Sequence, residues 1–239
     1  MIPYIRLENL LFIDIETVPV VPTFEELDED LQKLWRRKAK FFRDEMEAEE
    51  AFAKKGGLYA EFAKIVCISL AYLRQDDEHQ FNLRMKSFYG DDEVTILEDF
   101  RELIATYFNQ RKYTFCGHNI KDFDIPFLCR RMLMNDMVLP RKLTFVGGKG
   151  SQSPVVDTFQ IWRFGDYKNY TSLRLLAKSL KIEHPVEPLE ATQVSGMYWK
   201  DKDIEGIRDY CQRDVLTVAQ IMLRFKRFPL LTEENVQSS

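Results

Sequence analysis

The sequence contains little cysteine and no long apolar run. Its 4 cysteines are scattered and form no Cys-x-x-Cys pair, so we expect reduced thiols in a cytoplasmic protein. No apolar stretch is long enough to span a bilayer, and the N-terminus lacks a signal-peptide pattern, which predicts no membrane association. Several glycines lie close together in the segment 145–153, which lacks the spacing of a phosphate-binding P-loop. We interpret this segment as a mobile connecting loop.

The chain also lacks an excess of basic residues. The 34 Lys and Arg against 38 Asp and Glu give a net charge of -4, which argues against a protein that coats nucleic acid through a broad basic surface. This balance is compatible with a nuclease, in which bound metal offsets an acidic site. The 45% hydrophobic and 30% charged residues are typical of a globular protein. A length of 239 residues predicts a single domain over 1–239 with a helical insertion at 23–55.

Hydrophobic periodicity predicts alternating strands and helices. We expect the first strand to end at Thr17-Val18-Pro19, because proline cannot continue a ladder, and the second and third strands to form a hairpin. The predicted strands are 10–15, 65–73, 80–89, 113–116 and 155–158, and the predicted helices are 91–108, 125–135, 172–180 and 203–225. This order predicts an α/β fold, with a mixed five-stranded sheet flanked by helices.

The predicted insertion after the first strand is rich in charge and helix formers. Thr23 and Glu26 have the spacing of a capping box, and apolar residues follow at helical spacing, namely Leu27, Leu31, Leu34 and Trp35. Gly56-Gly57 is expected to end the insertion. Its segment 35–43 mixes aromatic and basic residues, which either form an amphipathic helix with Trp35 and Phe42 buried or bind single-stranded nucleic acid.

Two acids interrupt the otherwise apolar run 10–16. Because residues two apart on a strand point to the same face, Asp14 and Glu16 are expected to lie side by side. Burying two adjacent carboxylates is costly unless positive charge is supplied, and the run contains no Lys or Arg. Carboxylate oxygens suit Mg²⁺ or Mn²⁺, so the pair predicts a divalent cation site. The alternative is a strand end at which both acids meet water.

Two further acids occupy informative positions. Asp124 lies at or near a predicted helix start, with Pro126 in the first turn, where an acid is also a common helix cap. Asp214 and Tyr210 are four residues apart on the last predicted helix and share its apolar face. A buried acid needs a partner, which is either a metal ion or an arginine.

These segments resemble the three motifs of the DEDD superfamily, the DnaQ-like 3′→5′ exonucleases of ribonuclease H-like fold. The middle segment is closest to the proofreading domains of family B DNA polymerases, although no polymerase domain accompanies it. The third segment places Tyr210 four residues before Asp214, as in the tyrosine subtype; the histidine subtype would have His at the position of Asp209. The three segments are Phe-Ile-Asp-Ile-Glu-Thr at 12–17, Asn-Ile-Lys-Asp-Phe-Asp at 119–124 and Tyr-Cys-Gln-Arg-Asp at 210–214.

The resemblance implies phosphodiester hydrolysis with two divalent cations, Mg²⁺ or Mn²⁺. It implies that Asp14 bridges both ions, that Glu16 and Asp214 complete the site that activates water, and that Asp124 supports the second ion. Tyr210 would orient the attacking water, since a phenol with an ordinary pKa is a poor base at neutral pH. The product would be a nucleoside 5′-monophosphate.

Contacts to the substrate are expected beside the acids. Thr17, Asn119 and Phe123 are candidates to hold the terminal nucleotide, with Phe123 also a candidate for the core. His118 is interpreted as a structural hydrogen-bonding residue, and Asp157, at the end of a strand, is not required by the motif set.

The leading prediction is an exonuclease that acts on the 3′ end of single-stranded DNA. Three alternatives stay open from the sequence: the same chemistry on RNA, a catalytically silent nucleic-acid-binding module, and a ribonuclease H or resolvase-type endonuclease. The endonuclease family lacks the Tyr-x-x-x-Asp pairing on its last helix. Discrimination between DNA and RNA depends on contacts to one 2′-hydroxyl, which the sequence does not reveal.

Overall fold

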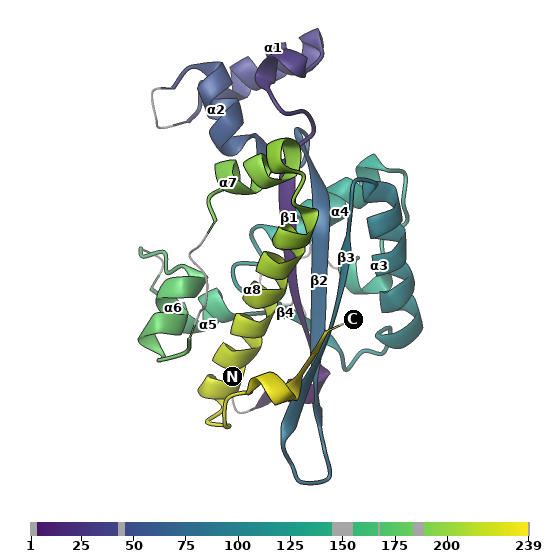
Figure 1. Ribbon diagram of the computed structural model, residues 1–239, viewed down its shortest axis with the longest axis vertical. Coiled ribbons are helices and arrows are strands. Elements are labelled where there is room, and N and C mark those ends of the chain that lie inside the picture. The colour runs from purple at the N-terminus through teal and green to yellow at the C-terminus, as the bar shows by residue number, and fades with distance from the viewer. Residues whose placement is uncertain (1–3, 43–45, 145–154, 167, 184–188, 239) are drawn as a thin grey trace.

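A mixed sheet forms the centre of the protein (Figure 1). The computed structural model describes residues 4–42, 46–144, 155–166, 168–183 and 189–238, so the predicted loop 145–153 lies outside the described residues. The strands stand in the order β5-β4-β1-β2-β3-β6, in which β1–β2 and β2–β3 are antiparallel and the other pairs are parallel. Their bounds are β1 (Leu10–Pro19), β2 (Ala63–Gln75), β3 (Phe81–Tyr89), β4 (Thr114–Gly117), β5 (Val155–Asp157) and β6 (Val236–Ser238).

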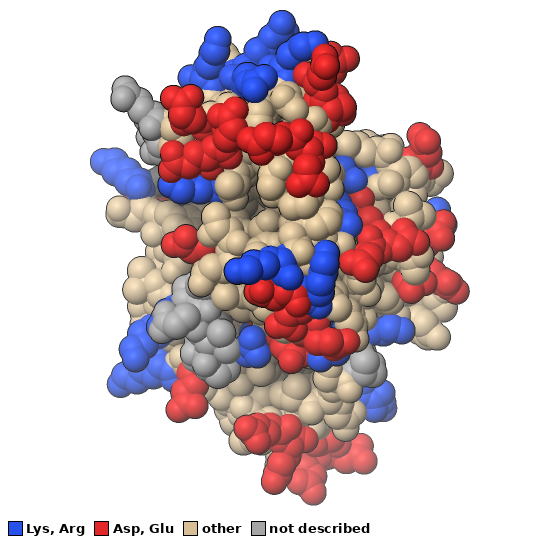
Figure 2. Space-filling view, turned by 45° about the horizontal axis from the view of Figure 1, so that its top comes forward, with Lys and Arg blue, Asp and Glu red and all other residues tan. Residues whose placement is uncertain are grey.

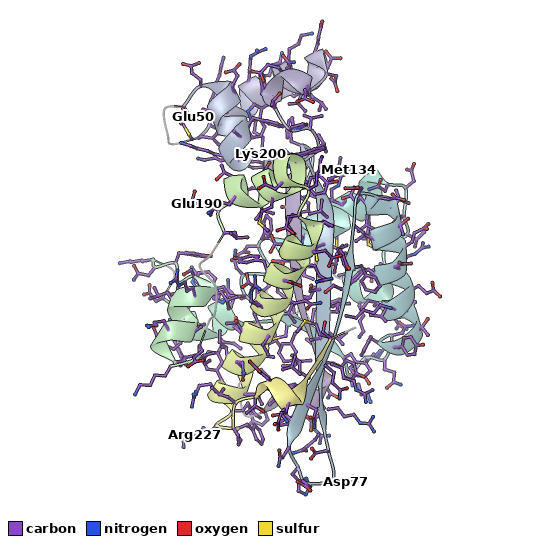
Figure 3. All side chains as sticks on the ribbon, viewed as in Figure 1. Glu50, Asp77, Met134, Glu190, Lys200 and Arg227 are labelled. Atoms are coloured by element: carbon purple, nitrogen blue, oxygen red, sulfur yellow. The ribbon has the colours of Figure 1, made fainter. Side chains whose placement is uncertain are left out.

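The predicted α/β fold with a mixed sheet and a β2–β3 hairpin is confirmed, and Asp77, labelled in Figure 3, lies in the turn of the hairpin. Two details of the predicted sheet need correction. The sheet has six strands rather than five, because the short C-terminal strand β6 pairs with β3. The first strand continues to Pro19 instead of ending near Thr17. The pairing with β2 shifts register between Glu16 and Thr17, and proline is tolerated as the last residue of the strand.

Helices cover both faces of the sheet (Figure 1). On one face, β1 packs Leu11 and Ile13 against α3 (Glu93–Tyr107) and α4 (Asp124–Met134). On the opposite face, it packs Leu10 and Phe12 against α8 (Ile204–Phe225). Because successive side chains of a strand point to opposite faces of the sheet, Asp14 and Glu16 lie on the same face as Phe12, which α8 covers. No helix in the described ranges is both long and apolar enough to cross a membrane.

Short helices connect β5 to α8. The structure confirms the predicted helix at 172–180 as α6 (Leu173–Ser179), with Ser172 as its cap. It also contains three elements that periodicity did not predict: α5 (Thr158–Arg163), α7 (Ala191–Gly196) and a π-helical turn (Met197–Asp201). Figure 3 labels Glu190 at the start of α7 and Lys200 in the π-helical turn, which leads into α8.

The helical insertion lies beyond the end of β1, and at the top of Figure 2 it presents Lys and Arg side chains with Asp and Glu side chains beside and below them. It contains α1 (Glu29–Ala39) and α2 (Ala48–Lys55), followed by the 3₁₀ helix η4 (Gly56–Leu58). Trp35 is 0% exposed and its Nε1–H donates to the Ala48 carbonyl at 2.8 Å, which confirms the buried alternative for this residue.

Two details of the predicted insertion are wrong. The cap of α1 is Asp28, whose carboxylate accepts from the Leu31 N–H, whereas Thr23 precedes a separate 3₁₀ turn. Leu34, expected in the apolar stripe, is 51% exposed. That residues 1–239 form one domain stays a prediction.

Candidate active site

The acids of β1 face an open pocket of about 340 Å³ between β1, α4, α7 and α8. Asp14 and Glu16 pair in register with Ser69 and Cys67 of β2, so all four side chains lie on the face that α8 covers. Both acids are partly exposed at the pocket. The pocket brings together every site residue that the sequence predicts: Asp14, Glu16, Thr17, Asn119, Phe123, Asp124, Tyr210 and Asp214.

Asp124 contacts β1 from the start of its helix. It is the first residue of α4, after the helix cap Phe123, so the alternative that Asp124 is an ordinary cap is wrong. Its side chain is 4% exposed, and its Oδ1 accepts a hydrogen bond at 3.2 Å from the N–H of Ile15, the residue between the two acids of β1. The neighbouring acid Asp122, by contrast, is exposed.

Tyr210 and Asp214 reach the pocket from successive turns of α8. The Tyr210 hydroxyl accepts a hydrogen bond at 3.4 Å from the Leu189 N–H. Burial, and then the negative charges of Asp214 and Glu16, raise the pKa of Tyr210 further above its ordinary value. The phenol therefore keeps its proton at neutral pH and remains a hydrogen-bond donor.

Burial and mutual repulsion dominate the electrostatics of the pocket. The pKa of Asp14 is raised well above its ordinary value by burial, and further by Asp124, Asp214 and Glu16. The pKa of Glu16 is raised in the same way, by burial first and then chiefly by Asp214. Burial raises the pKa of Asp124 to about 7, against the hydrogen bonds from its own backbone N–H and from that of Ile15. A proton or a cation in this pocket would relieve the repulsion.

The donor set fits a divalent cation. One carboxylate oxygen each of Asp14 and Glu16 lie within 4.8 Å of one another, and the Sγ of Cys211, which as a soft ligand does not suit Mg²⁺ or Mn²⁺, lies within the same distance of both. Within the described part of the chain, no Lys or Arg forms an ion pair with Asp14, Glu16 or Asp124. Carboxylates that converge without a basic partner are the ligands that Mg²⁺ and Mn²⁺ prefer.

The three candidate substrate contacts occupy different positions on the pocket wall. The Thr17 hydroxyl donates to the Gly57 carbonyl at 2.7 Å, so it is already engaged in joining β1 to η4. Asn119 has a left-handed backbone with φ of 63°. Phe123 is partly exposed and its ring centroid lies 5.4 Å from that of Phe127, so it belongs to both the wall and the core.

Asp157 and His118 hold the loop that carries Asn119. The buried carboxylate of Asp157 accepts hydrogen bonds from the backbone N–H groups of Asn119 and Lys121, and it also caps α5. His118 is hydrogen-bonded through one ring nitrogen to the Thr158 hydroxyl at 3.0 Å and through the other to a backbone carbonyl at 2.8 Å. These bonds confirm the structural interpretation of His118.

Sequence reasoning missed several residues of the site. Leu58 of η4 and Tyr170 line the pocket, and Cys211 contacts Asp14 from α8. Leu58 and Tyr170 lie in segments without periodicity, so no pattern indicated their position. The place of Cys211 beside Tyr210 in the third motif was the one available signal.

The chain is similar to known proteins in two respects. Its sequence matches the RNase H superfamily over residues 55–225, a range that excludes Asp14 and Glu16. Its fold is similar to the family B DNA polymerase of the hyperthermophilic archaeon Pyrobaculum calidifontis, at 13% identity and a TM-score of 0.53, over 91% of this chain and 24% of that chain. At this identity the likeness shows the fold alone.

Exonuclease I of E. coli, solved in complex with a dT13 oligonucleotide, is more distant, at 15% identity and a TM-score of 0.39, over 83% of this chain and 42% of that chain. The chain thus spans about a quarter of the polymerase chain and less than half of the exonuclease chain. No curated protein matches the sequence. The superfamily match covers most of the chain and the sheet has the α/β order expected for it, so the protein belongs to the RNase H superfamily.

Proposed function

We propose that the protein is a metal-dependent 3′→5′ exonuclease of the tyrosine DnaQ-like subtype that acts on single-stranded DNA. The observation that carries this proposal is the convergence of four carboxylates and one phenol, from β1, α4 and α8, in one open pocket. Clustered acids whose pKa values are raised by burial and by one another are typical of catalytic sites. The polymerase-like form of the middle motif favours DNA over RNA. A cytoplasmic location is part of the same proposal.

Two divalent cations, Mg²⁺ or Mn²⁺, are the cofactors in this proposal. Asp14 would hold both ions, Glu16 and Asp214 would complete one ion site, and Asp124 would support the other. When bound, the ions lower the pKa of the attacking water and stabilise the leaving 3′ oxygen. The raised pKa values of Asp14, Glu16 and Asp124 support cation binding, because a cation stabilises the ionised form of each acid.

The protein's own groups position the reactants. Tyr210 keeps its proton and orients the attacking water through its hydroxyl. Thr17, Asn119 and Phe123 line the pocket beside the acids, where they would contact the terminal nucleotide. Base stacking on Phe123 would be independent of sequence, as an exonuclease requires. Hydrolysis then releases a nucleoside 5′-monophosphate.

The test is digestion of a 5′-labelled single strand, prepared as DNA and as RNA, with Mg²⁺ or with EDTA. We expect a ladder that shortens from the 3′ end of the DNA in Mg²⁺ only, and no ladder with Asp14→Asn, which keeps the size of the side chain and removes its charge. Faster digestion of RNA would reassign the substrate. Internal cuts would contradict the exonuclease proposal in favour of an endonuclease, and binding without cleavage would favour a silent nucleic-acid-binding module.

A further inference from the structure

Cys211 occupies a position behind the acids that the proposed chemistry does not use. It lies on α8 immediately after Tyr210, but about 100° further around the helix, so it faces the sheet rather than the pocket opening. Its side chain is 0% exposed and packs in an apolar cluster with Val18, Val66 and Ile207. The thiol is therefore part of the rigid core that joins α8 to β1 and β2.

The thiol contacts Asp14 at two points. Its Sγ lies 3.4 Å from the Asp14 backbone carbonyl oxygen and 3.4 Å from Asp14 Oδ2, so its single S–H proton is shared between these two acceptors. In the described ranges, no other side chain or backbone group donates to the Asp14 carboxylate, and none donates to that of Glu16. A donor that touches both the main chain and the carboxylate of one residue restricts the rotamer of that residue.

Further polar contacts lie next to the contact between Cys211 and Asp14. Burial raises the pKa of the Cys211 thiol and the nearby Cys67 of β2 raises it further, while Cys67 in turn contacts the Ser69 hydroxyl at 3.7 Å. Ser69 is hydrogen-bonded to Ser87 of β3 at 2.8 Å, and Ser87 accepts from the side chain of Gln212 on α8 at 2.9 Å. A partly buried chain of polar side chains therefore runs from α8 across β3 and β2 to Cys67.

A thiol suits this place better than most donors. It is apolar enough for complete burial, yet its S–H is a hydrogen-bond donor. A weak donor engages Oδ2 without neutralising the carboxylate. Because only Oδ2 is engaged, Oδ1 has no hydrogen-bond partner among the described residues and remains able to ligate a cation.

We propose that Cys211 is a positioning residue, which holds the Asp14 carboxylate in the orientation that binds the divalent cations. The inference rests on the proposed function, because it takes Asp14 as a cation ligand. Hydrogen bonds to ligating carboxylates fix their orientation, and loss of such a bond weakens metal affinity by roughly tenfold or more. Cys211 does not touch the reacting atoms in this account.

The test compares Mn²⁺ affinity, measured by electron paramagnetic resonance of free Mn²⁺, in wild type and four variants. Cys211→Ala and Cys211→Val lack the donor, and the valine variant also fills the buried volume. Cys211→Ser keeps a donor at the same place. Cys129→Ala is the matched control, because Cys129 is 4% exposed, lies on α4 and packs in the core cluster on the other face of the sheet.

We expect the alanine and valine variants to bind Mn²⁺ roughly tenfold more weakly, with the serine and Cys129→Ala variants close to wild type. In the nuclease assay, the Mg²⁺ concentration for half-maximal rate should rise by the same factor, with the rate at saturating Mg²⁺ little changed. Thermal unfolding in EDTA identifies a variant that fails to fold.

Two results would overturn the inference. One is wild-type Mn²⁺ affinity in both donor-free variants; the other is a serine variant as weak as the alanine variant, since the donor would then be irrelevant. Because Mn²⁺ binding is measured without substrate, the exonuclease function and the positioning role of Cys211 are tested independently of each other. A wild type that cleaves no nucleic acid removes the proposed function, whereas unchanged Mn²⁺ affinity in an active enzyme removes only the role of Cys211.

Discussion

Asp14, Glu16 and Asp124 are held where their charges oppose one another. Burial is the largest cause of the raised pKa of each acid, and the charges of the neighbouring carboxylates add to it. Because the ionised form is disfavoured in the folded protein and not in the unfolded chain, each acid lowers the free energy of unfolding at neutral pH. A bound cation would reverse this effect, so stability and cation binding are coupled at these residues.

The first prediction concerns pH. The pKa of Asp124 is raised from 3.8 to about 7, so the folded state binds this proton more tightly than the unfolded state does. The resulting stabilisation is complete below pH 3.8 and is lost as the pH rises to about 7, and the raised pKa values of Asp14 and Glu16 act in the same direction. Urea unfolding in EDTA should show the free energy of unfolding fall across this range, by on the order of a few kcal/mol.

Two controls accompany this measurement. Asp124→Asn should reduce the pH dependence and leave the part due to Asp14 and Glu16, because the amide does not titrate, and Mg²⁺ should restore stability at the high end of the range. A free energy of unfolding that rises across the same range in EDTA would show that the acids do not oppose one another.

The second prediction concerns Tyr210. Tyr210 lines the pocket and its raised pKa keeps it protonated, so under the proposed function it orients the attacking water and does not act as a base. Tyr210→Phe should slow turnover roughly tenfold to a hundredfold, because a positioned hydrogen bond to the attacking water is lost. Isothermal titration should give unchanged Mn²⁺ binding. Lost Mn²⁺ binding would make Tyr210 part of the cation site, and an unchanged rate would leave it without a role.

Residue patterns predicted the acids well and their neighbours poorly. The two-residue period of a strand was enough to place Asp14 beside Glu16, and the predicted helix start was enough to single out Asp124. Cys211 escaped notice because a single buried thiol has no pattern of its own. The contact of that thiol with Asp14 depends on how α8 crosses β1, which is a property of tertiary packing.

At the scale of elements, a buried ion pair fixes α4 relative to α3 and β2. Arg131 of α4 bonds both carboxylate oxygens of Glu93 on α3, at 2.9 and 2.6 Å, and it also donates to the Ala60 carbonyl at 2.9 Å. Glu93 in turn accepts from the Ile65 N–H of β2 at 2.7 Å. Since α4 begins at Asp124, this network positions one wall of the pocket from the opposite face of the sheet.

The third prediction tests this network. Arg131→Ala should lower the free energy of unfolding by about 3–5 kcal/mol, because the Glu93 carboxylate is then left buried without its partner. Chemical denaturation measures the loss. Lys33→Ala is the matched control, since Lys33 forms only exposed ion pairs with Glu29 and Asp30, and its loss should change stability by less than about 1 kcal/mol. Equal effects of the two substitutions would contradict the proposed importance of the buried pair.

Element prediction succeeded where the chain has long periodic segments. The β2–β3 hairpin, α3 and α8 follow from apolar periodicity and from acids at helix starts. The elements that were missed are short: β6 has 3 residues, and α5 and α7 have 6 each. Such segments contain less than two helical turns or a single strand pair, so tertiary contacts decide their structure rather than local pattern.

At the scale of the whole molecule, the pocket lies where three distant parts of the chain meet. β1, α4 and α8 each supply acids, and η4, which directly follows the insertion at 23–55, contributes Leu58. The net charge of -4 gives no general attraction for nucleic acid, so the proposed function requires that binding depend on the pocket and its local surroundings. The insertion therefore ends three residues before a residue that lines the pocket, although the sequence assigned it no function.

The most direct measurement is anomalous diffraction from crystals soaked in Mn²⁺, with crystals of Asp14→Asn as the comparison. In the wild type we predict anomalous peaks in the pocket, within coordination distance of Asp14 and Glu16. In Asp14→Asn we predict that these peaks are lost. A pocket without Mn²⁺ at concentrations that support nuclease activity, or peaks bound only elsewhere on the protein, would contradict the claim that these carboxylates form a divalent cation site.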